Sequence, residues 1–333
     1  MNERITYIDL AKGFCIVLVI FFHSKAVLNC YYPIDTFLVS FRLPLYFFLS
    51  GLFFKDYSRF IIFLKKKTNR LMIPFFFFYV CFSVALPNIL HYSFNMHFET
   101  VVGWPSLWAF IWPCKYPNIP IWFLLCLFMM NIIFWWIHEI TRGLNESRSV
   151  MIIVLLCLLL GIIGYKYLYN NNNDYGNIFK SLQNMPFFCF GYLFSKYRGL
   201  YFFQVLSYRN IVLYFLVLFG ITFYFTTFVS WPHLFSFFLC GITGTLMILL
   251  LARLFNYLPL FNYIGRYSII LLLTHGIIIR VITPLYHYMD QYLSASITTF
   301  ILTILIVLSY YVIIPFMRRY LPYVTAQRSL LKE

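Results

Sequence analysis

Three ionisable residues interrupt the first apolar stretch of the chain: Asp9, Lys12 and His23. Lys12 and His23 are eleven positions apart, which in an α-helix is three turns and about 20°, so both project from one face, roughly 16 Å apart along the axis. Ionisable groups within a membrane span are costly and mark functional positions. A histidine exchanges protons near neutral pH, so His23 is a candidate general base, or acyl acceptor, in the attack of a hydroxyl on a thioester.

Four cations are expected at the cytoplasmic end of such a site: Lys12, Lys67, Arg70 and Arg266. A donor such as coenzyme A has phosphate groups, which cannot enter a membrane. It also has a long, thin arm, which can. The cations would hold the phosphates while the arm reaches inward. Asp9, one turn before Lys12, is expected to orient the lysine as an i,i+3 pair. From these residues alone, a proton-coupled transporter or a flippase stays open.

Two further polar residues lie within predicted spans. Arg42 precedes Pro44 by two residues, which predicts a kinked or broken helix whose freed backbone groups face protein or water. We expect Arg42 to line a cavity, the alternative being a side chain that reaches the interface. His275 follows Arg266 by nine residues, or about 180° of a continuous helix, so the two should face opposite sides. His275 is either a second cavity group or a packing residue.

The segment from Lys55 to Arg70 predicts an amphipathic helix in the membrane interface. Its apolar face is expected to hold Tyr57, Phe60, Ile61 and Leu64. The basic end either anchors the helix on anionic lipid or grips phosphates of a cosubstrate through Lys67 and Arg70, and both functions are compatible.

The elements that position these residues are predicted from composition. Of 333 residues, 62% are hydrophobic and 11% charged, and the mean hydropathy is +0.81. Soluble domains carry about 25% charged residues, so an all-α polytopic membrane protein is predicted. The net charge of +15 indicates membrane orientation and an anionic partner, not nucleic acid. The eight cysteines lack metal-ligand spacing, and no metal is expected.

Apolar runs of about 20 residues predict ten spans. They lie near 8–28, 34–54, 71–90, 118–140, 150–168, 180–196, 210–230, 233–254, 264–289 and 296–317. Most of the 25 lysines and arginines then fall on one side, which the positive-inside rule makes cytoplasmic, together with both termini. Residues 1–333 are expected to form a single membrane domain with a short basic tail from about 318 to 333.

The order of several motifs resembles the membrane-bound acyltransferase family 3, which includes O-acetyltransferases of cell-surface polysaccharides. Lys12 and His23, with ten residues between them after Ile8-Asp9-Leu10, match the first span of that family. Four other segments follow in the same order, at 41–51, 67–74, 121–124 and 264–275. Trp122-Phe123-Leu124 replaces the Trp-Ser-Leu motif and following glutamate of larger members, so the compact stand-alone branch is expected.

The resemblance implies about ten helices, an acyl-CoA donor that enters from the cytoplasm, and an essential histidine at His23. It implies donor contacts at Lys12, Lys67 and Arg70, with Arg266 added from its position at the cytoplasmic end. Asp9, Arg42, Trp122 and His275 are expected to support the cavity.

The expected reaction is O-acylation, with acetyl-CoA or another acyl-CoA as cosubstrate and no tightly bound cofactor. The expected acceptor is a hydroxyl of a cell-surface glycan or lipid-linked sugar, and the expected location is a bacterial inner membrane with its lipids as partners. A polysaccharide or small-molecule exporter, and a structural subunit of a glycan-synthesis complex, are the alternatives.

Overall fold

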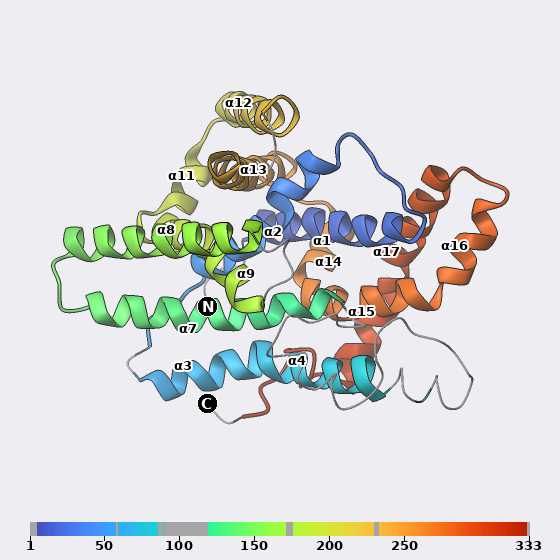
Figure 1. Ribbon diagram of the computed structural model, residues 1–333, viewed down its shortest axis with the longest axis horizontal. Helices are drawn as coiled ribbons and strands as arrows, with labels where there is room; N and C mark the ends of the chain where they lie inside the picture. The colour runs from blue at the N-terminus through green and yellow to red at the C-terminus, as the bar shows by residue number, and fades with distance from the viewer. Residues whose placement is uncertain are drawn as a thin grey trace. The chain divides into compact units, whose positions relative to one another are not determined.

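The computed structural model describes residues 5–57, 59–85, 89, 119–170, 176–229 and 233–331, and all regular elements within these ranges are helices (Figure 1). Six of them are long and apolar enough to cross a membrane. These are α1 (Thr6–Val27), α7 (Trp122–Thr141), α8 (Glu146–Asn170), α12 (Tyr208–Thr227), α13 (Leu234–Phe255) and α17 (Ala295–Tyr320). The described residues therefore form helices alone, as predicted, and six of these helices are candidate membrane spans.

The other four predicted spans are shorter or interrupted. The second is α2 (Asp35–Leu52). The third, predicted near 71–90, begins in η1 (Thr68–Met72) and continues as α4 (Ile73–Phe78) and η2 (Tyr79–Ala85), and its last residues, 86–88 and 90, lie outside the described part of the chain. The helix α3 (Phe60–Lys67) falls in the segment predicted to be amphipathic. The sixth is divided into α9 (Asn177–Gln183) and α10 (Met185–Lys196), and the ninth into α14 (Pro259–Arg266), α15 (Ser268–Val281) and α16 (Thr283–Asp290). The count of ten and the cytoplasmic side of the termini stay predictions.

Outward-facing apolar side chains on α12 agree with a lipid environment. Leu213, Leu216 and Val217 are each at least half exposed, although α12 is one of the candidate spans. A helix that is apolar around its circumference is stable in a membrane, whereas a surface helix of a soluble protein carries polar residues on its outer face.

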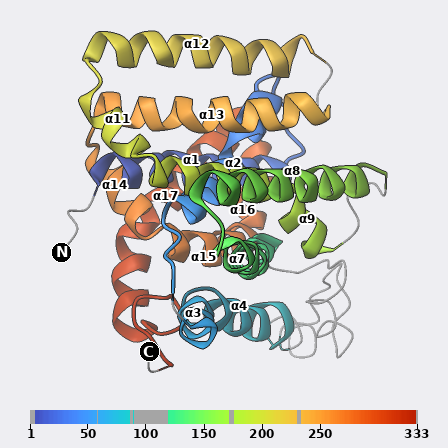
Figure 2. The ribbon, with the colours of Figure 1, turned by 90° about the vertical axis from the view of Figure 1, so that its left-hand side faces the viewer.

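The chain divides into two compact units, of which the first comprises residues 1–54, 187–271 and 278–313. In this unit α1 and α2 pack against each other and against α13, α12 lies alongside α13, and α14 runs against α1 (Figures 1 and 2). The short helix α11 (Gly199–Val205) adds Phe203 to the core. Leu10, Phe41 and Phe48 are fully buried in its core, to which α1 contributes one side of its helix.

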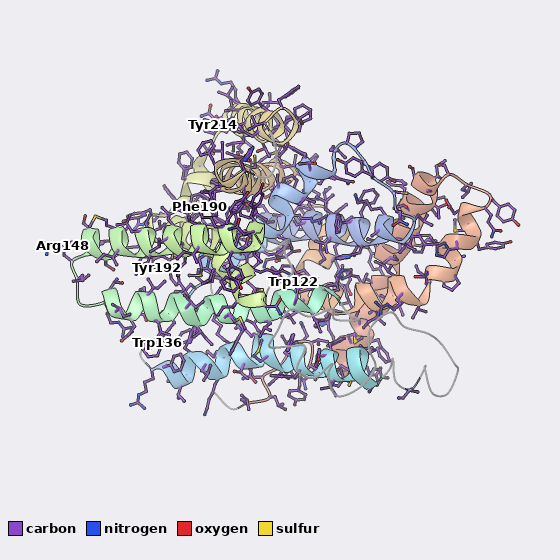
Figure 3. All side chains as sticks on the ribbon, viewed as in Figure 1. Trp122, Trp136, Arg148, Phe190, Tyr192 and Tyr214 are labelled. Carbon is purple, nitrogen blue, oxygen red and sulfur yellow. The ribbon has the colours of Figure 1, made fainter. Side chains whose placement is uncertain are left out.

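The second unit comprises residues 55–186, 272–277 and 314–333. The helices α7 and α8 form an antiparallel hairpin that α9 covers, a short helical turn (η3, Ile119–Ile121) precedes α7, and α3 packs against α7 (Figure 1). Figure 3 shows Trp122 at the start of α7 and Trp136 towards its end. These helices carry the basic segment and Trp122.

The buried face of α3 differs from the predicted one. Phe63 is fully buried and its ring lies 6.0 Å from that of Trp135, whereas Ile61, predicted to be on the apolar face, is 58% exposed. Phe60 does pack on Trp135, with ring centroids 4.8 Å apart. The predicted face was wrong because contact with the aromatic residues of α7 determines which face of α3 is buried.

Candidate active site

His23 lies in the last turns of α1 and is half-buried. Its ring meets the edge of its neighbour Phe22 at 5.4 Å. The guanidinium of Arg42 on α2 lies over the Phe22 ring, 3.8 Å from its centroid. Only 7% of Arg42 is exposed. Stacking on an aromatic face is a favourable setting for a buried guanidinium. A fixed positive charge is therefore held next to the turn that carries the candidate base.

The helix α2 continues through Pro44. The broken helix that the spacing of Arg42 and Pro44 predicted as one outcome is therefore not observed. Arg42 is also buried, which excludes the alternative in which its side chain extends to the interface. The Asp35 carboxylate at the start of α2 interacts electrostatically with it. That Arg42 lines a cavity stays a prediction.

Lys12 is held from three sides within the first unit. Its ammonium lies 3.9 Å from the Asp9 carboxylate, which confirms the predicted i,i+3 pair, and 5.5 Å from the centroid of the Phe53 ring. The hydroxyl of Tyr46 donates a hydrogen bond to the Lys12 carbonyl across 2.9 Å. Three quarters of the lysine side chain is enclosed, so its orientation is defined by these neighbours.

The close packing of α14 against α1 positions Arg266. A Cβ on Gly265 would lie 1.8 Å from the Asp9 carbonyl oxygen, and one on Gly13 would lie 2.1 Å from the Phe261 carbonyl oxygen. The two backbones are thus in direct contact. Arg266 directly follows this contact, is exposed, and has its guanidinium 5.5 Å from the ring of Tyr267.

The ninth predicted span is not one continuous helix, which corrects the orientation predicted for Arg266 and His275. The helices α14 and α15 meet at Tyr267 with an angle of 89° between them. The rotation of 180° over nine residues assumed an unbroken helix, so it does not apply. His275 belongs to the second unit and is fully buried.

An ion pair that the sequence analysis missed joins the ends of α1 and α2. The ammonium of Lys25 donates a hydrogen bond to the Asp35 carboxylate, and both side chains are less than 10% exposed. The Tyr32 amide donates to the same carboxylate at 2.9 Å. The opposite charges at the facing ends of two consecutive spans could have predicted this pair. Lys25 was instead counted only among the charges outside the cytoplasmic side.

Lys67 and Arg70 lie in the second unit, on the segment where the basic helix changes from α to π geometry. Burial, and then the neighbouring Arg70 guanidinium, lower the pKa of Lys67 to about 8. Arg70 itself is exposed. The repulsion between these two positive charges favours an anionic partner, because an anion would offset it. A π-turn is also a common feature of functional sites.

Trp122 at the start of α7 pairs with a cation. The Lys180 ammonium of α9 lies 4.9 Å from the centroid of the Trp122 ring. The half-buried indole therefore has a local structural contact within the second unit. Within the described part of the chain, no three His, Cys, Asp or Glu side chains gather as metal ligands would.

Comparison with known families decides the class of protein. The family model described as an acyltransferase domain matches residues 5–318. The chain belongs to this family, acyltransferase family 3. A search of curated proteins and a search of solved structures each gave no match.

The match places all of the predicted site residues of this family 3 acyltransferase inside its family domain. The matched domain begins one residue before α1 and ends at Arg318, near the end of α17. The family and the apolar helices together make the protein a membrane-bound acyltransferase. The residues of the tail after Arg318 lie beyond the domain.

Proposed function

We propose that this acyltransferase moves a short acyl group, such as acetyl, from a coenzyme A thioester to a hydroxyl of a cell-surface glycan or lipid-linked sugar. In this proposal it acts as a multi-pass protein of a bacterial inner membrane. No tightly bound cofactor takes part. Membership of an acyltransferase family favours transfer over the export function considered from the residues alone.

His23 is the proposed catalytic residue. It takes the proton of the acceptor hydroxyl while the hydroxyl oxygen bonds to the acyl carbon, after which the C–S bond breaks and the proton passes to the coenzyme A thiolate. In the covalent variant, a His23 nitrogen first takes the acyl group, coenzyme A leaves as the thiol, and the hydroxyl then attacks the acyl-histidine. Both routes give the acyl ester and free coenzyme A.

The arrangement around α1 is the main support for this role. His23 is half-buried near one end of a candidate membrane span, beside the Phe22 ring on which Arg42 is stacked. Lys12 lies on the same helix at a spacing that gives a common face. We propose that Arg42 contributes positive charge where the thioester carbonyl gains negative charge.

Basic residues of the chain are proposed to bind phosphate groups of the donor, and each is described within its own unit. In the first unit these are Lys12, oriented by Asp9, and the exposed Arg266. In the second unit they are Lys67 and Arg70, whose mutual repulsion a phosphate would relieve. Trp122 and His275 are proposed to be supporting residues, through packing within the second unit.

The test is the exchange of His23 for alanine, followed by transfer from radiolabelled acetyl-CoA in membrane vesicles. Loss of the imidazole should lower incorporation of label into the glycan fraction by at least 10²-fold, the usual contribution of a general base. The matched control is His287→Ala, since His287 is exposed on α16. Immunoblots of the membranes compare protein levels. A parental rate in His23→Ala would refute the assignment.

A further inference from the structure

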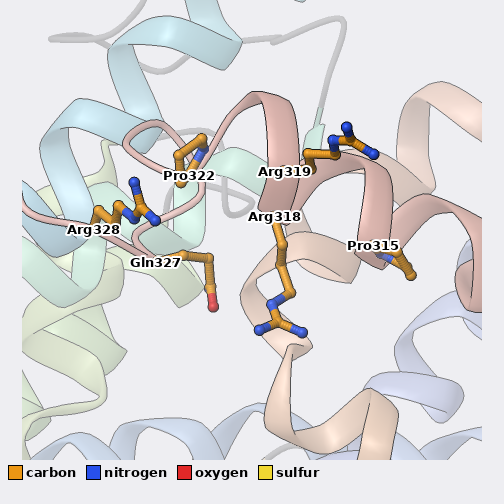
Figure 4. A pocket seen from close by; sticks show the side chains of 6 residues that line it. All are labelled: Pro315, Arg318, Arg319, Pro322, Gln327 and Arg328. Carbon is orange, nitrogen blue, oxygen red and sulfur yellow. The ribbon is translucent and has the colours of Figure 1, made fainter.

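A cavity of about 390 Å³ lies at the end of α17, within the second unit. The last turns of α17 and the tail that follows provide its lining, which is shown in Figure 4. The lining residues are Pro315, Arg318, Arg319, Pro322, Gln327 and Arg328. Only the first two fall inside the matched acyltransferase domain, so the cavity is mainly a feature of the tail. We refer to it as the tail pocket.

The tail pocket is strongly cationic. Three of its six lining residues are arginines, and none of the described residues that line it carries a carboxylate. Arg318 and Arg319 also lie in the last turn of α17, where the helix dipole favours positive charge. A guanidinium presents several N–H groups in a planar fork that matches the oxygens of a phosphate. The ligand that this lining favours is therefore an anion with several oxygens.

The loop that lines one side of the tail pocket is held by its own hydrogen bonds. The carbonyl oxygen of Pro322 accepts from the amides of Gln327 at 2.8 Å and Arg328 at 3.0 Å, and the Gln327 side-chain amide donates to the Thr325 carbonyl at 3.0 Å. Between them Ala326 has a φ of 57°, a conformation that disfavours residues other than glycine. Backbone strain of this kind tends to be retained at binding sites.

The end of the tail is attached to the basic segment of the same unit. The Asn69 side chain accepts from the amides of Leu330 at 3.0 Å and Leu331 at 2.8 Å, and donates to the Leu331 carbonyl at 2.9 Å. Asn69 is 3% exposed and lies between Thr68 and Arg70 in η1. The tail is thus anchored at both ends, by α17 and by Asn69, and the pocket between these anchors is a preformed one.

We propose that the tail pocket binds a phosphate group through the arginines that line it. A phosphate has enough oxygens to engage more than one guanidinium, which a single carboxylate does less well. The phosphate could belong to an anionic lipid headgroup, since α17 is a candidate membrane span and its last turn would lie near a membrane surface. It could equally belong to a soluble phosphate. The proposal does not depend on the role of His23.

The experiment uses the full-length protein purified in an uncharged detergent. Inorganic phosphate is titrated by calorimetry, and phosphatidylglycerol is added for native mass spectrometry, with phosphatidylcholine as the zwitterionic reference. The variant is R319Q/R328Q, and R319K/R328K retains the charge without the planar fork. R148Q/R209Q is the control, because Arg148 and Arg209 are exposed and their substitution removes the same charge elsewhere (Figure 3 labels Arg148).

We expect one of the two probes to bind wild type and R148Q/R209Q, and to bind R319Q/R328Q at least tenfold more weakly, with R319K/R328K in between. Binding of inorganic phosphate assigns a soluble ligand, and selective binding of phosphatidylglycerol assigns a lipid. If neither probe binds wild type, or if all variants bind equally, the proposal is wrong. Should R319Q/R328Q aggregate on size exclusion, R328Q is compared with R148Q by the same criteria.

Discussion

The Tyr46 hydroxyl of α2 donates a hydrogen bond to the carbonyl oxygen of Lys12 on α1, across 2.9 Å. The same side chain is hydrogen-bonded to Ser268 at the start of α15. One phenol therefore connects α1 and α2 to the first residue of α15, at the turn that carries a proposed donor-binding cation. This contact links the packing of α1 to its proposed function.

Replacing Tyr46 with phenylalanine should weaken this connection without leaving a large cavity. A net hydrogen bond contributes about 0.5–1.5 kcal/mol, so the free energy of unfolding should fall by about that amount. The KM for the acyl donor should rise more than kcat falls, because Lys12 loses a constraint on its position. Thermal unfolding in detergent and initial rates measure the two effects. Tyr214→Phe, on the exposed surface of α12, should change neither, and equal effects in both variants would contradict the prediction.

A methyl group at Gly265 should separate α14 from α1. The added Cβ would lie 1.8 Å from the Asp9 carbonyl oxygen and 2.7 Å from the Gly13 amide nitrogen, both of which are backbone atoms. Overpacking of this kind costs about 1–3 kcal/mol or more, so Gly265→Ala should unfold at a lower temperature and lose activity. Gly220→Ala is the matched control, since no atom lies within 4 Å of its added Cβ. Comparable stability of the two variants would show that α14 does not pack as described.

The buried ion pair between Lys25 and Asp35 should give non-additive mutant effects. Removing one partner leaves the other charge buried, at a cost of about 3–5 kcal/mol. Lys25→Met and Asp35→Leu should each destabilise strongly, whereas the double variant should recover a large part of the loss because neither charge remains. Unfolding of the four proteins in one detergent provides the cycle. Simple addition of the two single effects would show that the pair is not coupled.

Donor binding should depend on pH through Lys67, whose pKa is lowered to about 8. Above this pH the side chain loses its charge, so the KM for the donor should rise between pH 7 and 9.5 if Lys67 contacts phosphate. Lys67→Arg, which stays charged, should remove the rise, and Lys67→Met should give a high KM throughout. A profile unchanged in Lys67→Met would contradict the contact.

As the pH rises, the contribution of Lys67 to the free energy of unfolding should increase, whereas its contribution to donor binding should decrease. Its pKa is about 8 in the folded protein and 10.5 as the ordinary value, so between these values the unfolded chain binds more protons. The contribution of Lys67 to the free energy of unfolding should therefore rise as the pH increases from 8 to 10.5. Comparing wild type with Lys67→Arg over this range separates the effect from other titrations.

Local patterns in the sequence were sufficient for several features. The run of apolar residues around Lys12 and His23 predicted α1, and the i,i+3 spacing predicted the pair of Lys12 with Asp9. The order of motifs also indicated the acyltransferase family, because its pattern is carried by residue types at short spacings.

Contacts between distant segments required the tertiary structure. The buried side of α3 depends on Trp135 of α7, and the position of Arg266 depends on the backbone contact of Gly265 with Asp9. The break at Tyr267 separates two helices where hydropathy alone predicts one span. The tail pocket likewise forms only because the tail folds back from α17 to Asn69. Helical periodicity and hydropathy depend on neighbours within a few turns, so they determined the helices and the faces of α1, whereas partners far away in the chain are selected by packing and hydrogen bonding in the folded protein.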